Sequence, residues 1–159
     1  LKEIGFQAGA GFMVGLPNQT NEDLVNDLRF VKELEPAMCG IGPFIPHKDT
    51  PLRGCSAGTT EKTIILLAIT RLLLPKVLLP ATTALASIDS NGRNEGLRAG
   101  ANVIMPNLSP MAVRKKYSLY NNKAFILDED AEYRNTIEEK LKEAGFELVV
   151  SRGDNPDFV

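Results

Sequence analysis

The chain has 159 residues, of which 43% are hydrophobic and 24% charged, and its formal net charge is −2. This length is enough for one domain with a buried core, and the composition is ordinary for a globular protein. The slightly acidic balance excludes a basic nucleic-acid surface, no apolar run approaches the ~20 residues that span a bilayer, and no secretion signal opens the chain, so we expect a cytoplasmic protein without nucleic-acid or membrane partners.

The first predicted element is a glycine-rich strand at residues 8–14. Gly9, Gly11 and Gly15 alternate there with apolar residues, and a turn follows at residues 16–18. Glycine weakens the interior of a strand unless another backbone or a ligand comes close. The pattern therefore indicates either tight strand packing or a wall of a ligand site, and the residues alone leave both open.

A helix and a second strand are predicted next. Thr20 and Asp23 have the spacing of a capping box, and apolar residues follow at helical intervals. The predicted buried face of this helix carries Leu24, Val25, Leu28 and Val31. A strand at residues 37–41 then leads into a long polar loop at residues 42–59.

Two further units complete the predicted sheet. Thr60 is predicted to cap an apolar helix that Pro75 ends, and residues 77–79 are predicted to form a third strand. A short helix at residues 94–98 precedes a fourth strand at residues 102–105. Four strand–loop–helix units in this order predict an α/β fold with a parallel sheet, which is half of an eight-stranded α/β barrel.

The C-terminal part of the chain is predicted to differ from these units. Tyr133, Ile137, Leu141 and Ala144 lie at helical spacing, and Gly145 follows them. Residues 146–150 are predicted to add a small strand, and residues 151–159 to form a loose polar tail.

Candidate site residues follow the predicted strands, on the rim where α/β barrels bind ligands. Thr82 and Thr83 are either β-branched strand residues or two adjacent hydroxyls that bind an anion. Met105 is more typical of a core than of a cavity wall. Tyr117 and Tyr120 lie three residues apart on a short helix, so that one face presents both, with packing as the alternative role.

The histidine and the two cysteines are the remaining candidates for chemistry. His47 lies in a proline-rich loop, and we favour a surface histidine over a catalytic base. Cys39, on an apolar strand, is expected to be a buried inert thiol, and Cys55 to be exposed without activation. Two cysteines are too few for a disulfide framework.

Four motifs, in order along the chain, resemble one family. They are GFMVGLP at residues 11–17, GIGPFIPHKDTP at 40–51, PATTA at 80–84 and GANVIMPN at 100–107. The first resembles the fifth-strand glycine motif of radical S-adenosylmethionine (SAM) enzymes of the biotin synthase group. Together the four resemble the [FeFe]-hydrogenase maturases within that group, over about residues 1–123.

The resemblance implies a fold and a domain division. Residues 1–123 would form the C-terminal half, about strands 5–8, of a radical SAM (β/α)8 barrel, including the biotin/thiamin synthesis-associated region. Residues 124–159 would form a helical C-terminal extension.

The resemblance also implies an activity. In such enzymes a [4Fe-4S] cluster reduces SAM to release a 5′-deoxyadenosyl radical, and the barrel shields the radical from water. The implied substrate is a cysteine-bound iron carbonyl–cyanide complex on the way to the hydrogenase H-cluster, with other maturation proteins as partners. The implied SAM contacts are Gly11, Met13 and Gly15. The implied substrate or anion contacts are Thr82, Thr83, Met105, Tyr117 and Tyr120.

One departure from the family is large. The cluster motif Cys-x-x-x-Cys-x-x-Cys is absent, and three thiolates are needed to hold the cluster. The cluster ligands are therefore expected N-terminal to Leu1, with no metal ligand and no catalytic residue in this chain, which alone would be inactive. No accessory cluster is predicted either, since residues 124–138 hold no cysteine.

Three alternatives stay open. Methylornithine synthase and biotin synthase are sister enzymes of the same group, and the lack of an arginine at residues 81–84 counts against biotin synthase. The third alternative is a noncatalytic half-barrel that binds a small anion or a partner protein, although such a half-barrel would expose two sheet edges.

Overall fold

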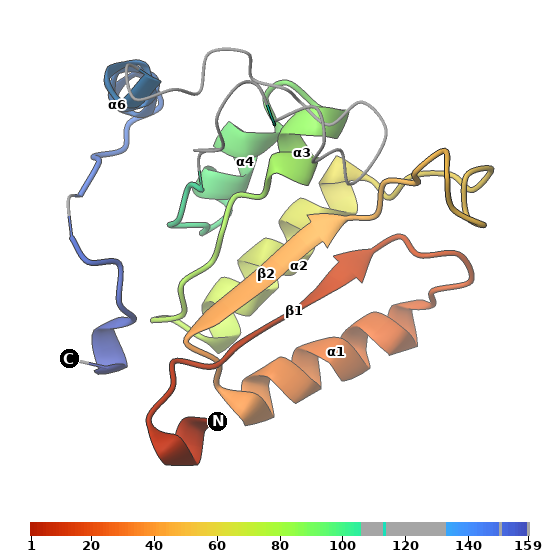
Figure 1. Ribbon diagram of the computed structural model, residues 1–159, viewed down its shortest axis with the longest axis horizontal. Helices are drawn as coiled ribbons and strands as arrows, with labels where there is room; N and C mark the ends of the chain where they lie inside the picture. The colour runs from red at the N-terminus through yellow and green to blue at the C-terminus, as the bar shows by residue number, and fades with distance from the viewer. Residues whose placement is uncertain (106–112, 114–132, 150, 159) are drawn as a thin grey trace.

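The protein has an α/β architecture in which helices pack against a parallel sheet, as predicted (Figure 1). The computed structural model describes residues 1–105, 113, 133–149 and 151–158. Its helices and strands, in chain order, are η1 (Lys2–Ile4), β1 (Gly9–Val14), α1 (Asn21–Leu34), β2 (Met38–Pro43), α2 (Thr60–Leu73), α3 (Thr83–Ile88), α4 (Gly92–Arg98), α6 (Tyr133–Glu143) and η2 (Pro156–Phe158). Among the described residues, no helix is both long and apolar enough to cross a membrane.

The sheet is shorter than predicted. Strands β1 and β2 pair in parallel from Gly9–Met38 to Val14–Pro43. The predicted third and fourth strands are wrong as strands: each forms a single parallel bridge, Leu78 to Met38 and Val103 to Pro80. Pro80 has no N–H to donate, which prevents a regular ladder from continuing there. Each of the four segments nevertheless lies parallel to the one before it.

The helix N-termini show how local sequence positions α1 and α2. In the predicted capping box, Thr20 Oγ1 accepts the Asp23 N–H at 3.2 Å and the Asp23 carboxylate accepts the Thr20 N–H at 2.7 Å. Helix α2 starts at Thr60, but the residue that caps it is Thr59, whose Oγ1 accepts the Lys62 N–H at 3.3 Å. The predicted cap was one residue late because adjacent threonines fit the pattern equally well.

The main core lies between the sheet and helices α1 and α2. The predicted face of α1 is buried at Leu24, Leu28 and Val31, whereas Val25 is 42% exposed and was wrongly placed on that face. The buried members of this core are Val14, Leu24, Leu28, Val31, Cys39, Ile41, Leu66, Leu67, Val77, Leu79 and Leu85. This packing holds the carboxyl ends of β1 and β2 in place.

A smaller core joins the C-terminal helix to the rest of the chain. Leu141 of α6 is buried together with Ala81, Leu97 and Ala101. Helix α6 is followed, as predicted, by Gly145 with a left-handed φ of 86°, a conformation that glycine adopts without strain. The predicted strand after it is wrong for residues 146–149, which are not in a strand.

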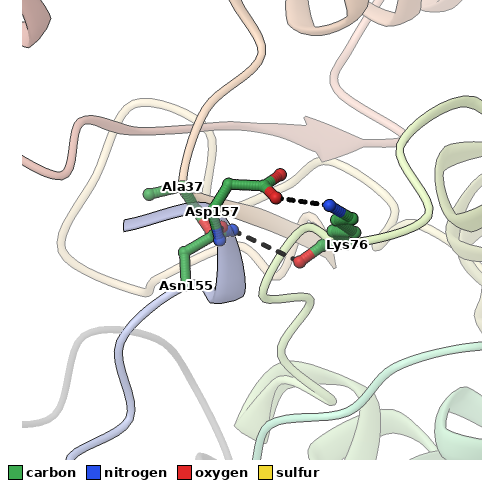
Figure 2. A network of polar contacts seen from close by, with 4 residues as sticks. All are labelled: Ala37, Lys76, Asn155 and Asp157. Carbon is green, nitrogen blue, oxygen red and sulfur yellow. Dashed lines mark hydrogen bonds and ion pairs between the residues drawn. The ribbon is translucent and has the colours of Figure 1, made fainter. Parts of the chain in front are cut away.

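The C-terminal tail is docked against the start of β2, and the prediction of a loose tail is therefore wrong. Asn155 is only 4% exposed. Its Nδ2 donates to the carbonyls of Ala37 at 2.8 Å and Lys76 at 3.2 Å, and the carboxylate of Asp157 pairs with Lys76 Nζ at 2.6 Å (Figure 2). The Asn155 N–H donates to Gln7 Oε1 at 3.0 Å. Asn155 thus joins the tail to Gln7 through its backbone N–H and to Ala37 and Lys76 through its side chain.

Candidate functional site

A cavity of about 930 Å³ lies over the carboxyl-terminal parts of β1 and β2. Small-molecule sites are typically apolar cavities of ~300–1,000 Å³ with a few polar groups, and open parallel sheets bind ligands beyond the carboxyl ends of their strands. The cavity is lined by Gly11, Phe12, Met13, Gly40, Gly42, Pro43, Phe44, Ile45, His47, Thr50, Pro51, Leu52, Thr82 and Ala84. It satisfies both conditions.

A smaller cavity of about 380 Å³ lies at the opposite end of the strands. Its two lysines are already engaged, Lys2 with the carbonyl of Leu34 at 2.7 Å and Lys76 with Asp157 at 2.6 Å. The cavity over the carboxyl ends is therefore the better candidate for a ligand site.

The glycines of β1 and β2 lie close to each other. Gly11 and Gly40 are register partners, and a Cβ on Gly11 would overlap the carbonyl of Gly40. A Cβ on Gly40 would meet nothing within 4 Å. Tight strand packing therefore accounts for the glycine at position 11, and the same lack of a side chain exposes backbone to the cavity.

Thr82 brings a hydroxyl group to the cavity wall. A Cβ on Gly42 would come within 2.9 Å of Thr82 Oγ1, so the glycine makes room for this threonine. Thr82 precedes α3, and its Oγ1 is buried without a hydrogen-bond partner among the described residues. A buried polar atom is rarely left unpaired in a folded protein. The hydroxyl is available to a ligand.

The turn after β1 is fixed by Gln19. Its Oε1 accepts the N–H of Gly15 at 2.7 Å and of Leu16 at 3.3 Å, and its Nε2 donates to the carbonyl of Met13 at 2.9 Å. Gly15 has a φ of 86°, and a Cβ there would overlap Gly58. Gly15 therefore shapes the turn and does not line the cavity.

The other predicted site residues are placed as follows. Met13 lines the cavity and is 51% exposed, next to Gly11 on one wall. Thr83 begins α3 and does not line the cavity. Met105 is 54% exposed and does not line the cavity either. Tyr117 and Tyr120 lie outside the described residues. The cavity thus brings together Gly11, Met13 and Thr82.

The cavity also includes residues that sequence reasoning did not select. Gly42 and the aromatic Phe44 close one wall. His47, predicted to be a surface residue, lines the cavity with a side chain that is only 18% exposed. The sequence feature that could have indicated this position of His47 is the run at residues 43–46, which begins and ends with proline and leads from the end of β2 into the loop.

Cys39 is fully buried in β2, which confirms the predicted burial, and burial raises the pKa of its thiol to about 11, so we expect this thiol to be inert. Cys55 is half-buried rather than fully exposed. Because the thiolate is the nucleophile, we expect Ellman's reagent at pH 8 to label Cys55 in the folded chain and Cys39 only after unfolding. A Cys39→Ala control should lose one labelled thiol in urea and none when folded. Rapid labelling of both thiols in the folded wild-type chain would contradict this.

The described residues contain no group of three His, Cys, Asp or Glu side chains able to hold a metal ion. No protein-family model matches the chain. Comparison with curated proteins, however, shows that the chain is a homologue of radical SAM enzymes over the matched segment, which confirms the predicted resemblance.

Within that class, the chain is a homologue of the "[FeFe] hydrogenase maturase subunit HydE" of Thermotoga maritima. The two are 52% identical over 130 residues, which cover 82% of this chain and 37% of that protein. The 3-methylornithine synthases of Methanosarcina acetivorans and Methanosarcina barkeri are 34% identical over 103 residues and 31% over 109. Those matches cover 65% and 69% of this chain, and 29% and 30% of the synthases. The chain thus spans about a third of the length of each curated relative.

Proposed function

We propose that the chain is the C-terminal half of the (β/α)8 barrel of a radical SAM enzyme that takes part in assembly of the [FeFe]-hydrogenase H-cluster. The 52% identity to the hydrogenase maturase over 82% of this chain carries the proposal. The parallel order of β1, β2 and the segments around Leu78 and Val103 supports the half-barrel. The proposed compartment is the cytoplasm, and the proposed partners are other hydrogenase maturation proteins.

The residues of this chain fit the two cofactors of that family differently. A [4Fe-4S] cluster needs thiolate ligands, and the sequence offers only Cys39 and Cys55, the first buried with a pKa of about 11. The two cysteines of this chain do not fit a [4Fe-4S] cluster. We propose that the ligands of the cluster lie in the rest of the longer protein. SAM fits better, because the cavity is large, mostly apolar and open to the backbone at Gly11.

SAM, when cleaved reductively, supplies a 5′-deoxyadenosyl radical in this family. The proposed contribution of this chain is to enclose the ligand and exclude water, which would otherwise permit side reactions. Gly11, Met13 and Gly15 are proposed to form and shape the wall on the SAM side. Thr82 and Thr83 are proposed to contact a substrate of the iron carbonyl–cyanide class.

The remaining substrate contacts of the proposal are Met105, Tyr117 and Tyr120. Met105 follows the bridge at Val103, on the segment that pairs with Pro80. Their role stays a prediction that rests on the resemblance.

We expect the double variant Thr82→Val/Thr83→Val, made in the longer protein, to cleave SAM at the wild-type rate but to lose at least about tenfold in hydrogenase maturation. Valine keeps the shape of threonine and removes only the hydroxyl, which can contribute roughly 1.5 kcal/mol or more to binding a charged ligand. The measurements are release of 5′-deoxyadenosine and activation of apo-hydrogenase.

Thr70→Val is the matched control for that variant. Thr70 lies in α2, fully buried, and its Oγ1 also has no hydrogen-bond partner among the described residues, but it does not line the cavity. The control should leave both activities unchanged. Unchanged maturation in the double variant would remove the two threonines from the proposed site.

The sister function, methylornithine synthesis, is favoured by the 34% and 31% identities to the two synthases. One assay distinguishes the two functions. The longer protein, reduced anaerobically with SAM, is supplied either with apo-hydrogenase and its maturation partners or with a mixture of free amino acids as candidate precursors of methylornithine. Hydrogenase activation without methylornithine supports the proposal, and the reverse supports the alternative. Failure to release any 5′-deoxyadenosine would leave the noncatalytic binding module as the better explanation.

A further inference from the structure

The imidazole of His47 is held by its own loop through one nitrogen only. Nδ1 accepts the backbone N–H of Asp49 at 3.1 Å, and the carboxylate of Asp49 lies 3.7 Å from the same nitrogen. The loop is further closed by Thr50, whose N–H and Oγ1 both donate to the His47 carbonyl, at 3.1 and 2.8 Å. The ring therefore has a defined position in the cavity wall.

This arrangement determines what the other nitrogen can do. To accept the Asp49 N–H, Nδ1 must keep its lone pair, which puts the proton of the neutral ring on Nε2. If the ring is protonated, Nδ1–H faces the Asp49 carboxylate instead, and Nε2 carries its proton as before. Nε2 is therefore a hydrogen-bond donor in both protonation states, and no described residue accepts from it.

The chemistry of the cavity lining points to the kind of group that would accept this hydrogen bond. Among the residues that the structure describes, neither Asp nor Glu lines the cavity, and the hydroxyl of Thr50 is already used within the loop. The side-chain donors left in the described part of the lining are His47 Nε2 and the Thr82 hydroxyl, and the rest of this lining is mostly apolar. An anionic group would meet no negative charge in this lining, and hydrogen bonds to an ionised acceptor are stronger than neutral ones.

We propose that His47 is a specificity-determining residue of this cavity, whose Nε2–H binds a carboxylate-like acceptor on the bound ligand. The inference rests on the proposed function only in taking this cavity as the ligand site.

Two substitutions separate this role from that of holding the loop. His47→Asn keeps an acceptor for the Asp49 N–H but removes the donor at the Nε2 position. His47→Gln places an amide N–H near the position of Nε2. If His47 mattered only for loop structure, asparagine would be the better replacement; if it binds the ligand, glutamine would be.

The test measures binding of two fluorescent probes to the 159-residue chain: dansylglycine, which carries a carboxylate, and its neutral amide, dansylglycinamide. We expect the wild-type chain to prefer dansylglycine. His47→Asn should weaken dansylglycine binding about tenfold and amide binding less than twofold, as for loss of one hydrogen bond to a charged group. His47→Gln should stay within about threefold of wild type for both. Urea unfolding of each variant checks that it folds.

Three results would overturn the proposal: no binding of dansylglycine to the wild-type chain, equal affinity for the two probes, or a folded His47→Asn variant that binds as wild type does. Release of 5′-deoxyadenosine by the longer protein is measured separately. Its absence, with the probe preference intact, would count against the radical SAM function and leave the role of His47 standing.

Discussion

Gly11→Ala is expected to lower the free energy of unfolding by about 3 kcal/mol, the upper range for the strain of overpacking. The added Cβ would overlap the carbonyl of Gly40, its register partner on β2. Backbone has no alternative rotamer, so the two strands must separate or slip. Urea unfolding monitored by circular dichroism measures the loss as a shift in the transition midpoint.

Gly40→Ala is the matched control, because the two glycines face each other across one ladder. A Cβ on Gly40 meets nothing within 4 Å, so this variant should stay within about 0.5 kcal/mol of wild type or gain slightly from a less flexible unfolded chain. Equal losses in the two variants would show that glycine acts through strand propensity rather than close packing. Because unfolding is measured without a ligand, the two variants report the effect of packing at Gly11 separately from any contact that its backbone makes with a ligand.

Local sequence predicts well those elements whose contacts are made between residues close together in the chain. The capping box of α1 involves only Thr20 and Asp23, and it is present as predicted. The third and fourth strands depend instead on partners far along the chain, and Pro80 interrupts the ladder where they would pair. Periodicity within a short apolar segment carries no information about such partners.

The candidate site shows the same division. The glycine pattern around Gly11 predicted a place of close backbone approach, and the structure supplies the neighbour, Gly40. The enclosure of His47 was not predictable, because it depends on how a loop folds back over the strands that precede it. The position of the Thr82 hydroxyl likewise depends on the absence of a side chain on Gly42, a residue forty positions earlier.

The docked tail was also beyond local reasoning. The contacts of Asn155 span 118 residues to Ala37 and 79 residues to Lys76, and nothing near Asn155 in the sequence marks it as buried. A polar residue in a segment of irregular structure normally lies at the surface. Its burial is possible because its side-chain amide and its backbone N–H find hydrogen-bond partners.

Asn155→Ala is expected to lower the free energy of unfolding by about 2 kcal/mol and to release the tail. The Ala37 carbonyl keeps a second partner, the N–H of Leu78 at 3.0 Å, whereas the Lys76 carbonyl loses the bond shown in Figure 2. The loss therefore corresponds to two part-buried groups left without their partner, the Lys76 carbonyl and the Asp157 N–H that Asn155 Oδ1 accepts at 2.9 Å, together with the Asn155 bond to the Ala37 carbonyl. Urea unfolding measures the first effect, and trypsin cleavage after the exposed Arg152 measures the second.

Lys76→Met distinguishes the buried amide from the exposed ion pair beside it. Lys76 and Asp157 are both largely exposed, so losing their pair should cost less than about 1 kcal/mol, and salt should weaken the pair further. The amide contacts of Asn155 are buried or part-buried and uncharged, so the effect of Asn155→Ala should be nearly independent of salt. If instead the methionine variant released the tail at low salt and the alanine variant did not, the tail would be held by charge, and Asn155 would only fill space.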